Sequence, residues 1–388
     1  MGNQKKTPVR VAFLGGRGIP PTYGGYCPLF EQVATHLAED LDFEITIYCR
    51  RSYFKERPRW YKGVRCIYLP VWRNKYFESL LFTGLSVIHS LLFARFDVIF
   101  VVDNANGPLM LPFWLIRKPT SLHTDGLGWK RRKWGKFGSK YYKWTEKVSA
   151  VLTNILVSDA RAIQDYYLEN YNAPSVFIPY GANFGNPPDD SWQEKYGLKS
   201  GEYFLIVTRI EPDNNTDILI REYKAAKLKH PLIIVGGARY PSDFSRAIEA
   251  EASNQVRFLG GIYESEILNG LYANAFAYLH GHVVGGTNPA LLRAMNACVA
   301  CVAFDINFTR EVLGEQGVFF SSAEGDLATR LQELESDPEQ TRSRGIALSK
   351  RATEEYRWDA VAEAYASMFK QLAGRQECTE AYEPGKFL

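Results

Sequence analysis

Short runs of consecutive apolar, β-branched residues alternate along the chain with longer segments whose apolar residues recur every three or four positions. The short runs predict buried strands, and the longer segments predict amphipathic helices. The predicted strands form two series, at residues 9–16, 43–49, 64–70, 96–102, 119–124 and 154–159, then 203–209, 231–237, 256–261, 275–281 and 298–304. Because strands that are apolar almost throughout are typical of parallel sheets covered on both faces, each series predicts a doubly wound α/β domain.

The length of 388 residues also favours two domains over one core. Gly, Asn and Pro cluster at residues 180–192, so we expect the boundary there. The predicted units are an N-terminal domain at 1–183, a C-terminal domain at 193–355, a closing helix at 356–375 and a loose tail at 376–388. Residues 79–93 are apolar but short, and they contain Ser, Thr, Gly and His, which predicts a buried core helix instead of a membrane span.

Charge and cysteine content narrow the function classes. The formal net charge of +3 gives no indication of nucleic-acid binding. Six cysteines show no disulfide framework, and the Cys298–Cys301 pair has no second pair, which favours a core strand over a zinc site. The first residues lack the apolar segment of a signal peptide, so we expect a cytoplasmic protein, at most peripheral to the inner membrane face.

Loops that follow the strands of open parallel sheets are the usual ligand sites. One such loop runs from His280 into an apolar helix, through Gly285, Gly286 and Thr287 to Asn288. Asn288 is a good N-cap and the following Pro suits the first helical position. Glycines allow the backbone to approach a ligand, and a helix N-terminus favours anions, so this loop predicts a diphosphate cradle. The alternative is a tight strand-to-helix turn without a ligand.

Three further segments carry candidate chemistry. Gly15, Gly16 and Gly18 follow the first strand, a loose dinucleotide pattern that raises the alternative of a nicotinamide-dependent oxidoreductase. Arg209 ends a strand, where it can pair with phosphate oxygens or simply lie on the surface. His123 and Asp125 leave another strand at its carboxyl end, where they face a reacting centre or have a structural role.

Residues 130–144 combine Lys and Arg with aromatic residues. This pattern predicts contact with an anionic lipid surface or a lipid-diphosphate acceptor. A solvated helix face is the alternative interpretation.

These segments, in this order, resemble the retaining glycosyltransferases of family 4, which have the GT-B fold. Within that family they are most similar to the rhamnosyltransferase-like branch of bacterial capsule and exopolysaccharide synthesis. The resemblance covers nearly the whole chain and rests on GGRGIPPTYGG at 15–25, DGLGWKR at 125–131, IPYGA at 178–182, RIEPDNN at 209–215, HGHVVGGTNPALLRAM at 280–295 and FTREVL at 308–313.

The resemblance implies two Rossmann-like domains facing a cleft, and a metal-independent, hexosyltransferase-type reaction without a cofactor. The donor would be a deoxythymidine, uridine or guanosine diphosphate sugar, with rhamnose as the branch's usual sugar, and the acceptor a saccharide or a lipid-linked molecule. Asp125 and His123 would lie at the reacting centre. The donor would contact Gly15, Gly16, Arg209, Asn214, Gly285, Gly286, Thr287, Asn288 and Arg293, and the acceptor would contact Tyr23, Gly24, Gly25, Trp129 and Lys130.

The chain also departs from the family pattern. Three positions where the family carries Glu are Cys27, Gly128 and Arg293 here, and Asn214 stands where Lys is usual. A carboxylate accepts hydrogen bonds from both ribose hydroxyls, whereas an Arg can only donate. We therefore expect Arg293 to pair with a phosphate, or with an acidic group of an unusual donor or acceptor. The alternative is a pseudoenzyme that keeps the fold and acts as a partner or scaffold.

Overall fold

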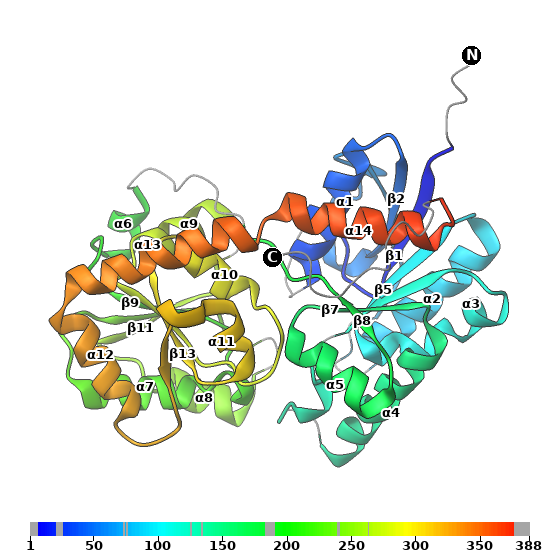
Figure 1. Ribbon diagram of the computed structural model, residues 1–388. Coiled ribbons are helices and arrows are strands. Elements are labelled where there is room, and N and C mark those ends of the chain that lie inside the picture. The colour runs from blue at the N-terminus through cyan, green and yellow to red at the C-terminus, as the bar shows by residue number, and fades with distance from the viewer. Residues whose placement is uncertain are drawn as a thin grey trace. The chain divides into compact units, whose positions relative to one another are not determined.

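The computed structural model of the protein describes residues 7–20, 26–72, 74, 77–124, 126–132, 135–182, 191–238, 241–262 and 264–375 (Figure 1). Contacts divide the chain into two compact units. The first contains Met1–Trp129, Lys136–Tyr180 and Trp358–Leu388, and the second contains Lys130–Gly135 and Gly181–Arg357.

The described part of the first unit contains an eight-stranded sheet in the order β3-β4-β2-β1-β5-β6-β7-β8. All neighbours pair in parallel except β3 with β4, which are antiparallel. The strands are β1 (Val9–Leu14), β2 (Phe43–Arg50), β3 (Trp60–Tyr61), β4 (Val64–Leu69), β5 (Val98–Val102), β6 (Thr120–His123), β7 (Ile155–Ser158) and β8 (Ser175–Phe177).

Helices cover both faces of this sheet. Because crossovers between parallel strands are right-handed, the direction of a connection along the sheet decides which face its helix covers. The connection from β1 to β2 runs toward the β3 edge and places α1 on one face. The connections from β4 to β5 and onward to β8 run toward the β8 edge and place their helices on the other face. The last helix, α14, packs on α1 and β1. The helices are α1 (Tyr26–Glu39), η1 (Arg51–Tyr53), α2 (Glu78–Phe93), η2 (Asn104–Met110), α3 (Leu111–Leu115), η3 (Gly128–Lys130), α4 (Lys136–Leu152), α5 (Arg161–Tyr171) and α14 (Trp358–Leu372).

The second unit has a fully parallel sheet in the order β11-β10-β9-β12-β13-β14 within its described residues. Its strands are β9 (Phe204–Val207), β10 (Leu232–Val235), β11 (Val256–Gly260), β12 (Ala277–His280), β13 (Ala300–Phe304) and β14 (Val318–Phe320). Its helices are α6 (Ser191–Tyr196), η4 (Pro212–Asn214), α7 (Thr216–Ala226), α8 (Asp243–Glu249), α9 (Ser265–Ala273), α10 (Pro289–Asn296), α11 (Asn307–Leu313), η5 (Gly314–Gln316), α12 (Asp326–Ser336) and α13 (Pro338–Glu355).

The predicted fold class of two doubly wound parallel-sheet domains is confirmed, and each predicted strand is present. The sequence pattern missed β3, β8 and β14, which have only two or three residues each. Such short edge strands contribute too few alternating or apolar positions to stand out from a loop.

One prediction about α2 is wrong. The helix at residues 79–93 is not buried in the core: its apolar side chains Leu81, Ile88 and Leu92 are exposed by 52%, 54% and 69%. Its buried face instead contains Thr83, Ser86 and Ser90 together with Phe82 and Val87. None of the described helices is long and apolar enough to cross a membrane.

Candidate functional site

The second unit has its topological switch point between β9 and β12. From β9 the chain proceeds outward to β10 and β11, and then returns to β12 on the other side of β9. The loops that leave β9 and β12 therefore diverge at the carboxyl edge of the sheet. This is the place where doubly wound sheets bind their ligands.

Three loops at this edge are fastened to one another by backbone contacts. Gly236, which follows β10, has φ +125° and a Cβ there would lie 1.8 Å from the carbonyl oxygen of Thr208. Gly281, after β12, packs so closely that a Cβ would lie 2.3 Å from the carbonyl oxygen of Asn214. The Val283 amide donates to the carbonyl oxygen of Asp213 at 3.1 Å. Only glycine permits these approaches, so the loops form one rigid platform.

Asn214 holds the loop after β9 in shape. Its side-chain amide donates to Thr208 Oγ1 at 2.9 Å and to the carbonyl oxygen of Arg209 at 2.7 Å. Asn214 is buried. The predicted contact of Asn214 with the donor stays a prediction. Its two side-chain hydrogen bonds stabilise the conformation of the loop.

The N-terminus of α10 has the geometry that the sequence indicates. The Asn288 side chain caps the helix by accepting from the Ala290 amide at 2.9 Å, and Pro289 occupies the first turn. Gly285 has φ +143° and open space around its Cα. Gly285, Gly286 and Asn288 line a small pocket with His280 and His282. A helix N-terminus beside glycines and open space can receive an anion.

Two stacked histidines lie behind this loop. The rings of His280 and His282 are 4.3 Å apart at their centroids with an angle of 12° between their planes. Burial lowers the pKa of His280 to about 3. Burial, followed by the charges of His280, Arg209 and Arg131, lowers the pKa of His282 well below its usual range. Both rings are therefore neutral at physiological pH, and Arg209 supplies positive charge next to them.

Replacing His280 with glutamine should reduce the acid sensitivity of folding. An unfolded chain protonates this ring near pH 6.5, whereas the folded chain keeps it neutral, so stability falls as pH drops below about 6.5. For one such histidine the loss between pH 7 and pH 5 is about 2 kcal/mol. Urea unfolding at both pH values should show this smaller loss in His280→Gln. His36→Gln, on α1, is the control, and an unchanged pH dependence in His280→Gln would contradict the account.

Arg209 and Arg293 differ in their surroundings. The side chain of Arg209 is 39% exposed, and its Nη1 lies 3.4 Å from Glu211 Oε1, a weak contact. Arg293, on α10, is half-buried, and its side chain makes no hydrogen bond or ion pair with the described residues. It lies near the buried hydroxyl of Tyr272: burial raises the pKa of Tyr272, and the guanidinium opposes that rise. A half-buried cation without a carboxylate partner is suited to an anionic ligand.

In the first unit, the glycine loop after β1 is held by a buried ion pair. Arg50, only 6% exposed, donates to the carbonyl oxygens of Gly15 and Gly16 at 3.0 and 3.2 Å and pairs with Glu78 at 2.9 Å. A Cβ at Gly15 would lie 2.7 Å from the carbonyl oxygen of Val102. Close packing against other residues of the protein explains why glycine stands at these two positions. The predicted contact of Gly15 and Gly16 with the donor stays a prediction.

The carboxyl end of β5 carries residues that the sequence reasoning missed. Asp103 has φ +74°, which is unusual for a residue with a side chain, and its carboxylate accepts from the Ala105 amide at 3.0 Å. Asn104 and Asn106 are buried beside it. The signal was present as Asp-Asn-x-Asn-Gly directly after an apolar strand. Strained polar residues at a switch point are candidates for function.

His123 lies at the end of β6, where the structure buries it almost completely. Its Nδ1 is 2.8 Å from the carbonyl oxygen of Thr124. The rings of Tyr26 and Tyr180 meet the imidazole edge to face, with centroids at 5.6 and 5.8 Å. This packing fixes the orientation of the His123 ring. A fixed orientation is compatible with a catalytic role and with a structural role.

Trp129 belongs to a cage of aromatic rings around Lys143. The Lys143 ammonium lies 4.7 Å from the Trp129 ring centroid and 4.8 Å from that of Tyr166. The Trp129 indole donates to the Tyr166 hydroxyl at 3.1 Å, and that hydroxyl donates to the buried carboxylate of Glu146 at 2.8 Å. The structure therefore holds Trp129 rigidly, next to the position where the family has Glu and this chain has Gly128.

Restoring a side chain at Gly128 should destabilise the protein. A Cβ at this buried position would lie 2.7 Å from Cδ1 of Tyr142, so the tyrosine ring occupies the space. Overpacking of this kind costs about 1–3 kcal/mol. Gly128→Glu should lower the unfolding midpoint, and the additional change Tyr142→Ala should recover part of the loss. A Gly128→Glu protein as stable as the parent would refute this account.

Some predicted residues cannot be placed. Tyr23, Gly24, Gly25 and Asp125 lie outside the described residues. The basic run at 130–144 is divided: Lys130–Gly135 belongs to the second unit, where the Arg132 amide donates to Asp213 Oδ1 at 2.7 Å, and α4 belongs to the first. The predicted contact of this run with an anionic lipid surface or a lipid-diphosphate acceptor stays a prediction.

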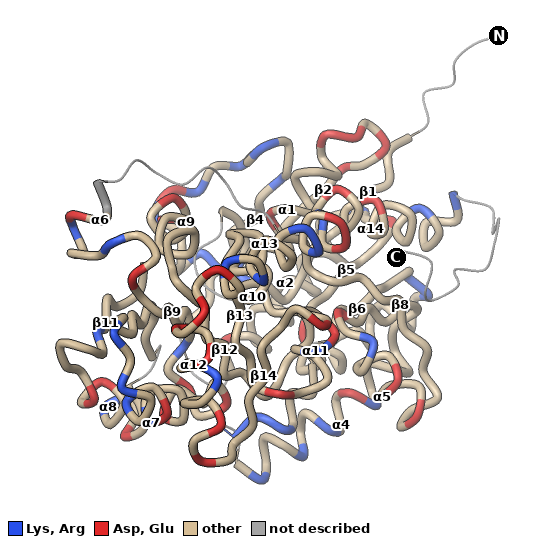
Figure 2. The backbone as a smooth tube through the Cα atoms, turned by 60° about the vertical axis from the view of Figure 1, so that its left-hand side comes forward, with Lys and Arg blue, Asp and Glu red and all other residues tan. Residues whose placement is uncertain are grey.

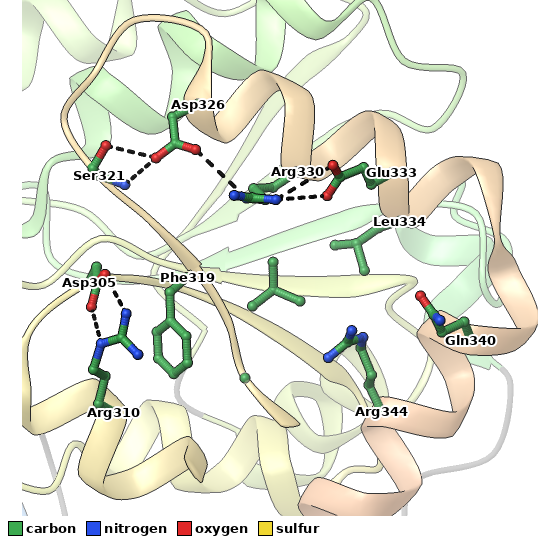
Figure 3. Close-up of a pocket in the computed structure, with 12 residues that line it drawn as sticks. Asp305, Arg310, Phe319, Ser321, Asp326, Arg330, Glu333, Leu334, Gln340 and Arg344 are labelled. Atoms are coloured by element: carbon green, nitrogen blue, oxygen red, sulfur yellow. Dashed lines mark hydrogen bonds and ion pairs between the residues drawn. The ribbon is translucent and has the colours of Figure 1, made fainter. Parts of the chain in front are cut away.

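A wider pocket of about 400 Å³ lies away from these loops, between α11, β14, α12 and α13 (Figure 3). Two of its three guanidinium groups are paired with carboxylates: Arg310 Nη2 is 2.7 Å from Asp305 Oδ2, and Arg330 Nη1 is 3.2 Å from Glu333 Oε2. The third, that of Arg344, lies 3.5 Å from the carbonyl oxygen of Gln316. Among the described residues, no three His, Cys, Asp or Glu side chains gather as metal ligands.

Comparisons with known proteins agree with this architecture. Residues 9–183 match a domain of unknown function (DUF1972), and residues 188–351 match the glycosyl transferases group 1 family. No curated protein matches the sequence significantly. The segment that matches this family, 188–351, lies within the second unit.

Solved structures with the same fold include sucrose-phosphate synthase from Thermosynechococcus elongatus, at TM-score 0.77 and 18% identity, covering 95% of this chain and 100% of that one. Anabaena HepE in complex with UDP-glucose has TM-score 0.74 and 12% identity, covering 93% and 99%. An Escherichia coli trehalose-6-phosphate structure bound with UDP-2-fluoro glucose has TM-score 0.71 and 11% identity, also covering 93% and 99%. The two parallel-sheet domains of this chain thus have the GT-B architecture of glycosyl-transfer proteins.

Proposed function

We propose that the protein is a metal-independent, retaining glycosyltransferase that transfers a sugar from a nucleoside diphosphate sugar to a saccharide or lipid-linked acceptor. The donor binds on the second unit, at the loops after β9, β10 and β12. The observation that carries the proposal is the platform at the switch point, where glycine contacts join these loops beside Arg209 and the capped N-terminus of α10. The group 1 family match supports the reaction class.

The electrostatic part of the reaction follows from this platform. When the sugar leaves, negative charge develops on the diphosphate, and groups aimed at that charge stabilise the transition state. The Arg209 guanidinium, only weakly engaged by Glu211, supplies a bidentate donor. Backbone amides from Gly285 to Thr287, together with the positive end of α10, supply the rest.

Arg293 is the residue that indicates a donor different from the one usual in the family. It is half-buried and has no ion-pair partner among the described residues, and it lies on the helix that begins at Asn288. We assign it to an anionic group of the donor, a phosphate or an acidic substituent of the sugar. Two of the solved structures named above, HepE and the Escherichia coli structure, contain uridine nucleotides, which makes a uridine diphosphate sugar the first donor to try alongside the deoxythymidine compound.

The second candidate function is a glycosyltransferase-like pseudoenzyme. It is favoured by Gly128, where the Tyr142 ring fills the space of a side chain, and by Arg293 in place of a ribose-binding carboxylate. A pseudoenzyme would bind no donor productively. Introducing Arg293→Glu and Cys27→Glu together would then create turnover that the parent lacks.

Release of nucleoside diphosphate tests the two functions. The purified protein is incubated with deoxythymidine, uridine and guanosine diphosphate sugars, with and without saccharide acceptors, and the released diphosphate is measured. We expect release with one base and faster release with an acceptor. Absence of release from every donor, with release in the Arg293→Glu/Cys27→Glu variant, establishes the pseudoenzyme instead.

A further inference from the structure

The outward face of α2 is more apolar than its inward face. Leu81, Leu85, Ile88 and Leu92 form a stripe at helical spacing, and their exposed fractions run from 41% to 69%. The buried face carries Ser86 and Ser90, whose hydroxyls donate to carbonyl oxygens of the same helix. A helix of a water-exposed protein has the opposite arrangement, so this face is suited to an apolar environment.

Two neighbouring helices extend this apolar surface. On α3, Trp114 is 50% exposed and Leu115 is 65% exposed. On α4, Phe137 is 90% exposed and Trp144 53%. α2, α3 and α4 all pack on η2, and right-handed crossovers place them on the same face of the sheet. We call the exposed side chains of these three helices the α2–α4 surface.

The charges on the α2–α4 surface are all positive. Lys136, Lys140 and Lys147 on α4 are exposed, and their helical spacing places them on the same side of the helix as Phe137 and Trp144. Figure 2 shows Lys and Arg positions in blue along α4. Arg95 and Arg117 are exposed just after α2 and α3. The only acidic residues in these segments, Glu78 and Glu146, are buried and hydrogen-bonded. No exposed carboxylate is therefore present at residues 77–95, 111–118 or 135–152, all within the described chain.

We propose that the α2–α4 surface docks on an anionic phospholipid bilayer. Leucine, phenylalanine and tryptophan side chains enter the boundary between headgroups and acyl chains, and the lysines reach the lipid phosphates. A second copy of the chain fits poorly, because a two-fold contact through this surface would bring lysines together without carboxylates between them. The proposal does not depend on the transfer reaction.

Vesicle sedimentation tests the proposal. The full chain is mixed with phosphatidylcholine vesicles, and with vesicles that also contain phosphatidylglycerol, and the protein in the pellet is measured. We expect binding only to the anionic vesicles, and weaker binding as salt screens the charges. Since each lysine near such a surface contributes roughly a fivefold change in affinity, Lys136→Glu/Lys140→Glu/Lys147→Glu should weaken binding by at least about 100-fold.

Matched variants distinguish vesicle binding through the α2–α4 surface from a general effect of charge or hydrophobicity on binding. Lys195→Glu/Lys199→Glu/Lys350→Glu makes the same charge change on exposed lysines of the second unit and should leave binding intact. Leu85→Gln/Ile88→Gln/Leu92→Gln should abolish binding, whereas Leu41→Gln, at a 93% exposed position outside the surface, should not. Circular dichroism checks that every variant is folded.

Tryptophan quenching provides a second measurement. Brominated lipids in the anionic vesicles should quench the tryptophan fluorescence of the parent protein. The quenched component should be missing in Trp114→Phe/Trp144→Phe and still present in Trp60→Phe, where the replaced indole lies on β3. Failure to sediment with either vesicle would overturn the proposal. So would dimers of the parent protein that dissociate in the Leu85→Gln/Ile88→Gln/Leu92→Gln variant, because the surface would then be an interface between copies.

Discussion

Arg209→Ala should lower the rate of nucleoside diphosphate release by about 10²–10³-fold while the protein stays folded. This is the range measured when one preorganised donor to a developing negative charge is removed. The guanidinium makes only a 3.4 Å contact with Glu211 and is 39% exposed, so the fold does not depend on it. The measurement is the initial rate of diphosphate release together with the thermal unfolding midpoint.

Two controls sharpen this result. Arg221→Ala removes an exposed guanidinium on α7, away from the three loops, and should leave the rate unchanged. Arg209→Lys keeps the charge but loses the planar fork, and should recover only part of the rate. If Arg209→Ala releases diphosphate as fast as the parent, the donor phosphates do not bind at this loop.

Arg50→Met should destabilise the first unit by about 3–5 kcal/mol, because it leaves Glu78 buried and uncompensated. The Gly15 and Gly16 carbonyl oxygens also lose their donor. In a thermal scan this corresponds to a midpoint lower by roughly 10 °C. The double variant Arg50→Met/Glu78→Met removes both charges and should regain much of the loss.

Lys62→Met serves as the comparison within the same unit. Lys62 is 62% exposed and lies 3.5 Å from Glu31, and surface pairs of this kind contribute at most about 1 kcal/mol. Equal midpoints for Arg50→Met and Lys62→Met would show that the buried pair does not hold the glycine loop.

Local features of the site were predictable from the sequence. The Asn288 cap and Pro289 are neighbours along the chain, and a helix start depends only on such neighbours. Uninterrupted apolar runs likewise identified the strands of four or more residues in both sheets, since a parallel sheet buries both faces of its strands. The strand order, and with it the switch point at β9 and β12, came from the structure.

Features that depend on distant residues were not predictable. The loop glycines 236 and 281 pack against Thr208 and Asn214, and Gly128 lies under Tyr142; no spacing along the chain encodes these contacts. The sequence analysis placed α2 in the core because apolar residues at helical spacing identify an apolar face. The spacing does not tell whether that face is buried in the protein or exposed at its surface. Its hydroxyl-bearing face is the buried one, since Ser86 and Ser90 satisfy their hydrogen bonds within the helix.

The central claim, that a nucleoside diphosphate binds at the platform of the second unit, is tested most directly by thermal unfolding with ligands. The protein is heated with deoxythymidine, uridine and guanosine diphosphates, and Arg209→Ala is treated in the same way. A ligand at 100 times its dissociation constant adds about 2.7 kcal/mol, which raises the midpoint by several degrees. We predict such a rise with one base in the parent protein, and a much smaller rise in Arg209→Ala. No rise with any of the three, or equal rises in both proteins, would contradict the claim.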